Sequence, residues 1–241
     1  MRLALDIGNS RIKWGLRQDR RWHSHGALPT AKWPGVEALL RAHREVTEVW
    51  ACHVAEASVA AGIESVCAAA QIPLRWIKSS SSAGGIINHY DNPGQLGTDR
   101  WVALIGARAR TTHPVIVVNA GTATTIDALS SAGEFLGGMI LPGLTLMRQA
   151  LHDGTAALPS EPSGCFAPFP RNTADAIVTG SIAATVGAIE SLAQTLAVHE
   201  SSEVHRLLSG GHAETLQPHV KMPADRVTYL VLEGLARLME N

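Results

Sequence analysis

The sequence has few of the features that mark secreted, metal-binding or nucleic-acid-binding proteins. Its three cysteines, Cys52, Cys67 and Cys165, lie far apart and form no C-x-x-C pair. This spacing predicts neither a disulfide framework nor a zinc site, and it favours a reducing compartment. The 20 basic and 21 acidic side chains give a formal net charge of −1, with no long block of either sign. We therefore expect no electrostatic surface for a nucleic-acid partner.

Long apolar runs are also lacking. Asp6 interrupts the apolar start of the chain, so the first residues do not resemble the apolar core of a signal peptide. No uninterrupted apolar run approaches the roughly 18 residues that span a bilayer. These absences predict a soluble, cytoplasmic protein with no membrane partner.

The pattern that is present predicts an α/β protein. Short apolar runs separated by Gly, Asn and Ser indicate strands and turns, and longer Ala- and Leu-rich segments indicate helices. Residues 79–97 are polar and glycine-rich and are expected to form a loop, after which Thr98 is a candidate N-cap. The expected strands are 2–7, 11–17, 20–26, 46–52, 74–77, 115–129 with a central turn, 133–141 and 204–211; the expected helices are 36–43, 57–70, 98–110, 143–151, 174–199 and 225–239.

The first hairpin has a second version later in the chain. When LDIGNSRIKWGL (5–16) is placed over VNAGTATTIDAL (118–129), Asp6 aligns with Asn119, Gly8 with Gly121, and Leu16 with Leu129. Two similar hairpins 113 residues apart suggest two duplicated α/β halves around a cleft. The match is short, and apolar–turn–apolar hairpins are common, so chance similarity remains an alternative.

The two hairpins carry groups suited to phosphate. A glycine in each turn lets backbone N–H groups approach a ligand closely, and neighbouring hydroxyl and amide side chains suit phosphate oxygens. Asp6, at a strand end, can hold a hydrated Mg²⁺ ion through its waters, and Lys13 adds a positive charge. The alternative is an ordinary hairpin in which Asp6 only stabilises the turn.

A second candidate segment is GTDR, residues 97–100. Asp99 can accept a proton from a substrate hydroxyl, and Arg100 can bind an anionic group through two parallel hydrogen bonds. The alternative is structural, because an acidic residue is common in the first turn of a helix, where it interacts favourably with the helix dipole.

The order of these motifs is more distinctive than any one of them. DIGNS, GTDR, NAGTATT, GGMILPG, NTADAI and SGG follow one another between residues 3 and 235. This series resembles the type III pantothenate kinase family, also called the Bvg accessory factor family. The resemblance implies the duplicated, ribonuclease H-like fold of actin, Hsp70 and the sugar kinases, with an N-terminal half at 1–112 and a C-terminal half at 113–241.

The resemblance also implies an activity and a set of site residues. The family phosphorylates pantothenate with ATP and Mg²⁺, the first step towards coenzyme A, and it is dimeric. Asp99 then corresponds to the general base, and SGGHA (209–213) lies near the adenosine. The implied ATP-binding residues are Asp6 (through Mg²⁺), Ile7, Gly8, Asn9, Ser10, Arg11, Ile12, Lys13 and Thr122, and the implied pantothenate-binding residues are Tyr90, Gly97, Thr98, Asp99, Arg100 and Thr173.

One position departs from the family pattern. The second phosphate motif usually begins with an Asp that helps to bind K⁺ or NH₄⁺, whereas this chain has Asn119. Asn keeps an oxygen ligand but removes the charge, which places the monovalent-cation site in doubt. Two other functions stay open on the same fold: a kinase for a different small acceptor, and a non-catalytic regulator as the Bvg name implies.

Overall fold

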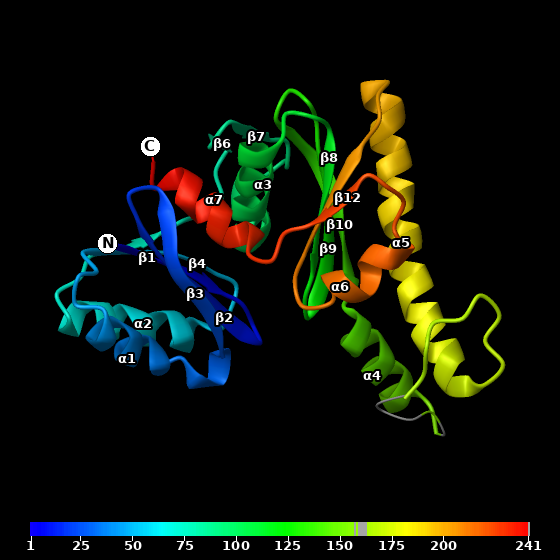
Figure 1. Ribbon diagram of the computed structural model, residues 1–241, viewed down its shortest axis with the longest axis horizontal. Helices are drawn as coiled ribbons and strands as arrows, with labels where there is room; N and C mark the ends of the chain where they lie inside the picture. The colour runs from blue at the N-terminus through cyan, green and yellow to red at the C-terminus, as the bar shows by residue number, and fades with distance from the viewer. Residues whose placement is uncertain (157, 159–162, 241) are drawn as a thin grey trace. The chain divides into compact units, whose positions relative to one another are not determined.

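A computed structural model describes residues 1–156, 158 and 163–240 of the chain (Figure 1). The chain forms two compact units. The first unit comprises Met1–Thr111 together with Tyr229–Asn241, and the second unit comprises Thr112–Thr228. The last residues of the chain thus group with the first unit, whereas division by sequence order assigns them to the C-terminal half.

The first unit contains a five-stranded sheet in the order β3-β2-β1-β4-β5. Strand β1 pairs antiparallel with β2 and parallel with β4. The outer strands continue this pattern, because β3 is antiparallel to β2 and β5 is parallel to β4. The strands are β1 (Arg2–Ile7), β2 (Arg11–Gln18), β3 (Arg21–Pro29), β4 (Glu48–His53) and β5 (Leu74–Trp76).

Alternation along β1 decides which residues reach which face of this sheet. Leu3, Leu5 and Ile7 are fully buried in a core that also includes residues of α1 (Gly35–Ala42) and α2 (Ala57–Ala69). Because side chains alternate between the faces of a strand, Asp6 points to the opposite face. Figure 1 shows α1 and α2 lying together along one side of the sheet.

Helices α3 (Thr98–Arg110) and α7 (Leu230–Leu238) pack against each other within the first unit. Their contact depends on two glycines. A Cβ atom at Gly106 would clash with the Leu230 carbonyl oxygen, and one at Gly234 would clash with the Val102 carbonyl oxygen. This close approach explains why α7 belongs with the first unit although it lies at the far end of the sequence.

The second unit repeats the topology of the first. Its strands run in the order β10-β9-β8-β11-β12, with β8 antiparallel to β9 and parallel to β11, and β12 parallel to β11. The five positions and directions match those of β3-β2-β1-β4-β5, which confirms the predicted duplication. The strands are β8 (Val115–Ala120), β9 (Ala123–Leu129), β10 (Glu134–Pro142), β11 (His205–Ser209) and β12 (Ala224–Arg226).

The two hairpins differ in one respect that the sequence overlay misses. In the first hairpin Asp6 pairs with Lys13, and the Gly8 amide donates to the Arg11 carbonyl. In the second hairpin Asn119 pairs with Thr125, and the Gly121 amide donates to the Ala123 carbonyl. The second turn is therefore one residue shorter.

The shorter turn changes which residues correspond in the second strand of each hairpin. Thr125, rather than Ile126, occupies the place of Lys13. By the same shift Leu16 corresponds to Ala128, and the ungapped alignment of Leu16 with Leu129 is wrong.

Helix α5 (Thr173–Glu200) provides most of the helical side of the core of the second unit. Its residues Val178, Ile182, Ile189, Ala193 and Leu196 are buried in one cluster with the strands. Among the described helices only α5 is long enough to span a membrane and contains an 18-residue stretch that is apolar enough to do so, with a mean hydropathy of 1.5. A search for uninterrupted apolar runs misses it, because Gly, Ser and Thr occur throughout. Helices α4 (Leu144–Gly154) and α6 (Ala213–Leu216) complete this unit.

Three local predictions need correction. The expected loop at 79–97 contains a small antiparallel hairpin, β6 (Ser82–Ala83) and β7 (Ile86–Asn88). The N-cap of α3 is Gly97, and Thr98 is the first helical residue. The expected closing helix 225–239 is shorter, because residues 224–226 pair with β11 as a strand and the helix begins only at Leu230.

Candidate active site

The first candidate phosphate turn follows β1. The Gly8 amide donates to the Arg11 carbonyl across the turn (3.0 Å), and Asn9, Ser10 and Arg11 are exposed. Buried Thr30 supports the turn: its hydroxyl donates to the Gly8 carbonyl at 2.7 Å, and its amide donates to the Ser10 carbonyl at 3.0 Å. The turn is thus fixed from the protein side, while three of its side chains remain accessible.

Asp6 and Lys13 lie directly opposite each other on β1 and β2. The Lys13 ammonium is 3.0 Å from the Asp6 carboxylate, which is buried. Burial lowers the pKa of Lys13, but the Asp6 carboxylate outweighs this effect and raises the pKa above its usual value. Lys13 therefore keeps its positive charge at neutral pH.

Two of the predicted ATP-binding residues can offer only their backbone. Ile7 and Ile12 pair across the hairpin, and both side chains are fully buried in the core. Their side chains anchor the ends of the turn, which limits any contact with a ligand to main-chain atoms.

Asp99 lies in the first turn of α3, at the candidate acceptor motif. Its Oδ1 accepts a hydrogen bond from the Arg100 amide at 2.8 Å. Burial raises the pKa of Asp99, the Asp6 carboxylate raises it further, and the Arg100 amide acts in the opposite direction. The hydroxyl of Thr98 donates to the His53 carbonyl at the end of β4 (2.8 Å) and so ties the start of α3 to the sheet.

Arg100 and Tyr90 come together from different segments. The Arg100 guanidinium donates to the Tyr90 hydroxyl at 3.0 Å and lies 5.7 Å from the centre of its ring. Arg100 is buried, whereas Tyr90 is half-buried. The structure thus brings Tyr90, Gly97, Thr98, Asp99 and Arg100 into one region of the first unit.

The second candidate phosphate turn follows β8. Thr122 and Ala123 are exposed, Thr124 and Thr125 are buried, and the Thr122 carbonyl accepts a hydrogen bond from the Gly143 amide at 2.9 Å. Asn119 lies opposite Thr125 at the base of this turn. Thr173, also in the second unit, is the exposed first residue of α5.

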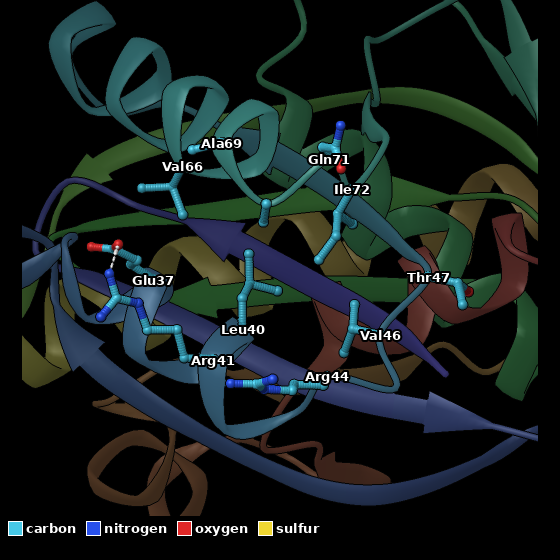
Figure 2. A pocket seen from close by; sticks show the side chains of 11 residues that line it. Glu37, Leu40, Arg41, Arg44, Val46, Thr47, Val66, Ala69, Gln71 and Ile72 are labelled. Carbon is cyan, nitrogen blue, oxygen red and sulfur yellow. Dashed lines mark hydrogen bonds and ion pairs between the residues drawn. The ribbon is translucent and has the colours of Figure 1, made fainter.

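A separate hollow of about 770 Å³ lies in the first unit, lined by residues of α1, α2 and the segments that follow them. Figure 2 shows Leu40, Val46 and Ile72 forming its apolar wall, with Arg41 and Arg44 at the side. Its eleven lining residues include none of the candidate site residues. Val46 and Thr47 precede β4, so this hollow lies at the amino end of that strand. Ligands of open α/β sheets bind at the carboxyl ends instead, where Asp6 and His53 lie.

The acidic groups near the first turn suit an ion held chiefly by other ligands. Within residues 1–156, 158 and 163–240, no three His, Cys, Asp or Glu side chains gather closely enough to form a metal cage. A single carboxylate at Asp6 fits Mg²⁺, which keeps most of its water and binds nucleotide phosphates.

Two units of one topology, each with a glycine-containing turn after its first strand, define the duplicated α/β fold of actin, Hsp70 and the sugar kinases. Solved structures of other proteins share this fold. A Campylobacter jejuni protein placed in the Baf family of transcriptional activators superposes with a TM-score of 0.65 at 19% identity, covering 99% of this chain and 97% of that one. A glucokinase from an Antarctic psychrotroph superposes with a TM-score of 0.51 at 10% identity, covering 100% and 98%.

The chain belongs to the type III pantothenate kinase family, whose model matches residues 2–195. The type III pantothenate kinase of Aromatoleum aromaticum is 46% identical over 236 residues, which cover 98% of this chain and 96% of the relative. The enzyme of the same name from Thiobacillus denitrificans is 42% identical over 237 residues, covering 98% and 96%. The predicted family is thereby confirmed, and the chain is a kinase.

Sequence reasoning missed the residues that support the turns from a distance. Thr30 braces the first turn from 22 positions away, and His212 contacts the second turn through its backbone amide, which donates to the Ala120 carbonyl at 3.0 Å. Cys52, which pairs with Asp6 across β1 and β4, is another residue of this region that the sequence pattern does not indicate. Burial and the nearby Asp6 and Asp99 carboxylates raise the pKa of its thiol well above the usual value, so the thiol stays un-ionised. No local sequence signal marks Thr30 or Cys52. Gly210 and Gly211 mark this segment in the sequence, but they do not indicate a role for the His212 side chain.

Proposed function

We propose that this chain transfers the γ-phosphoryl group of ATP to the hydroxyl of pantothenate, giving 4′-phosphopantothenate and ADP in the first step of coenzyme A biosynthesis. The observation that carries the proposal is the match to type III pantothenate kinases over nearly the whole chain. The acceptor motif supports it, because Asp99, Arg100 and Tyr90 are placed together by the fold.

Asp99 is the proposed general base. The raised pKa of this half-buried carboxylate makes Asp99 a stronger proton acceptor than an ordinary aspartate. Asp99 accepts the hydroxyl proton of pantothenate, the oxygen forms a bond to the γ-phosphorus, and the bond to the β-phosphate oxygen breaks to release ADP. Such transfers depend mainly on positioning and charge neutralisation.

Arg100 is the proposed partner of the pantothenate carboxylate. A guanidinium can make two parallel hydrogen bonds to a carboxylate, and the Tyr90 hydroxyl already holds one of its nitrogens in place. Gly97, Thr98 and Thr173 are the remaining proposed pantothenate-binding residues.

The two turns are the proposed phosphate-binding elements. Residues 6–13 supply the exposed turn, the Lys13 charge and the Asp6 carboxylate, which would hold Mg²⁺ through its water ligands. Bound Mg²⁺ neutralises phosphate charge in kinases of this class. Thr122 of the second turn is the other proposed phosphate contact.

Two further properties are proposed from the family. The chain forms a homodimer, which sedimentation or light scattering would measure. A K⁺ or NH₄⁺ ion binds near Asn119 only weakly or not at all, because the amide supplies an oxygen without the negative charge of Asp.

The experiment that tests this function is a measurement of ADP release with Mg-ATP, with and without pantothenate. Pantothenate-dependent turnover, together with a product of the mass of phosphopantothenate, is the expected result. ATP binding without turnover would contradict it. A panel of other small alcohols would then test a different acceptor, and a gel shift with promoter DNA at physiological salt would test a regulatory role.

A further inference from the structure

Three segments of the second unit meet at its phosphate turn. The turn itself is Ala120–Ala123; the Gly143 amide donates to the Thr122 carbonyl at 2.9 Å, and the His212 amide donates to the Ala120 carbonyl at 3.0 Å. Gly210 has φ +94°, and a Cβ there would lie 2.5 Å from the Ala120 carbonyl oxygen. The chain before His212 therefore lies directly against the turn.

The His212 side chain makes a second connection at the same place. Its Nε2 lies 3.2 Å from the hydroxyl of Thr145, in the first turn of α4. Its Nδ1 is buried, without a hydrogen-bond partner of standard geometry. His212 is thus linked to the start of the turn through its backbone amide and to helix α4 through its ring. Helix α4 begins directly after Gly143, whose amide binds the Thr122 carbonyl of the turn.

The environment of the imidazole favours its neutral form. Burial lowers the pKa of His212, the backbone of Gly121 acts in the opposite direction, and the positive charge of Arg148 lowers it further. A neutral ring keeps one nitrogen as an acceptor and the other as a donor. The Thr145 hydroxyl can then donate to Nε2 while Nδ1–H is directed to the buried side.

We propose that His212 is a positioning residue for nucleotide binding, and that its hydrogen bond to Thr145 holds the Gly121–Thr122 turn in place for the ATP phosphates. The inference rests on the proposed kinase function, because it assigns that turn to phosphate binding. His212 acts through the turn and through Thr145.

A double-mutant cycle tests the inference with nucleotide affinity as the readout. His212→Leu and Thr145→Val each remove one partner of the hydrogen bond, and each should weaken Mg-ADP binding by about five- to tenfold, the worth of one net hydrogen bond. The double variant should bind no more weakly than either single one. His212→Gln, whose amide can reach the same hydroxyl, should recover most of the affinity.

Controls separate positioning from folding. His199→Gln changes an exposed histidine in the last turn of α5 and should leave Mg-ADP binding unchanged. Thermal unfolding of every variant identifies any loss of folded protein. In turnover assays, His212→Leu should raise KM for ATP several-fold while changing KM for pantothenate by less than twofold.

The outcomes divide cleanly. A dissociation constant for His212→Leu within twofold of the wild type, in a folded protein, would overturn the inference, as would additive losses in the double variant. Failure of the proposed function is a different result, because it would show as absence of pantothenate-dependent turnover in the wild-type protein, whereas Mg-ADP affinity is measured without the acceptor.

Discussion

Lys13 places its ammonium 3.0 Å from the buried carboxylate of Asp6, directly across the first hairpin. The pair serves the fold and the proposed phosphate site at once, because Lys13 neutralises a charge that would otherwise be buried alone.

Replacement of Lys13 by Met should lower both stability and activity. Removing one partner of a buried pair costs about 3 kcal/mol of unfolding free energy, and the lost positive charge should raise KM for ATP. Because the pKa of Lys13 is raised above 10.5, its contribution is fully present below about pH 10.5 and is lost only as the pH rises through the folded-state pKa. Denaturant unfolding should therefore show the same deficit at pH 6 and pH 9, and Lys32→Met, at an exposed position, should show none.

Asp99→Asn should abolish most turnover yet leave the protein as stable as the wild type, or more so, at neutral pH. Asn can still accept the Arg100 amide hydrogen bond but cannot take a proton. Since the folded-state pKa of Asp99 is raised, ionisation costs stability as the pH rises above the unfolded value of 3.8. Melting temperatures should favour Asp99→Asn at pH 7 and converge below pH 3.8, while kcat falls by about 100-fold or more. Near-wild-type kcat would refute the role of general base.

Tyr90→Phe should affect pantothenate more than ATP. The change removes the hydroxyl that accepts from Arg100 but keeps the ring, so the guanidinium loses one positioning contact. We expect KM for pantothenate to rise by about tenfold, the worth of one hydrogen bond to a charged group at the low end of its range. Initial rates at varied pantothenate and saturating ATP measure it; an equal rise in KM for ATP would contradict this assignment.

Asn119→Asp should strengthen any dependence on a monovalent cation. The substitution adds a negative charge at the base of the second turn, opposite Thr125, where it favours a bound cation. ADP release measured against increasing KCl or NH₄Cl, with NaCl at matched ionic strength as the reference, should show activation in the variant beyond that of the wild type. An identical salt response in the two proteins would exclude Asn119 from the cation site.

Gly234→Ala should destabilise the first unit. The added methyl group collides with the Val102 carbonyl oxygen at the contact of α7 with α3, a backbone atom that cannot move aside without a helix shift. A loss of about 2–3 kcal/mol, typical of overpacking, is expected in denaturant unfolding. Gly187→Ala, in α5 with open space around the added atom, is the matched control and should stabilise by up to about 1 kcal/mol.

Local features of the sequence predict local features of this structure well. The turn at Gly8–Asn9–Ser10 and the bounds of the helix 98–110 follow from contiguous residues, and the structure has both where the sequence predicts them. Asp99 and Arg100 are consecutive in the sequence, so their proximity does not depend on the fold. The duplication is also visible in the sequence, because the two hairpins share a residue pattern.

The remaining features depend on partners far away in the chain. Residues 224–226 form a strand because they pair with the edge of β11, a partner far away in the sequence. The apolar spacing after these residues is helical, and it therefore led to a predicted helix that begins too early. Thr98 gives its hydroxyl to His53 rather than to its own helix. Thr30 and His212 support the two turns through contacts that no local periodicity encodes.

The packing of α7 on α3 has a consequence for synthesis of the protein on the ribosome. Helix α7, which packs against α3 at Gly106, is synthesised only after the whole second unit, residues 112–228, has been translated. The second unit is continuous in sequence and can complete its sheet and core first. In the first unit, the apolar face of α3 stays exposed until α7 has been made. Nascent chains released before Leu230 should therefore be the species that chaperones and proteases recognise.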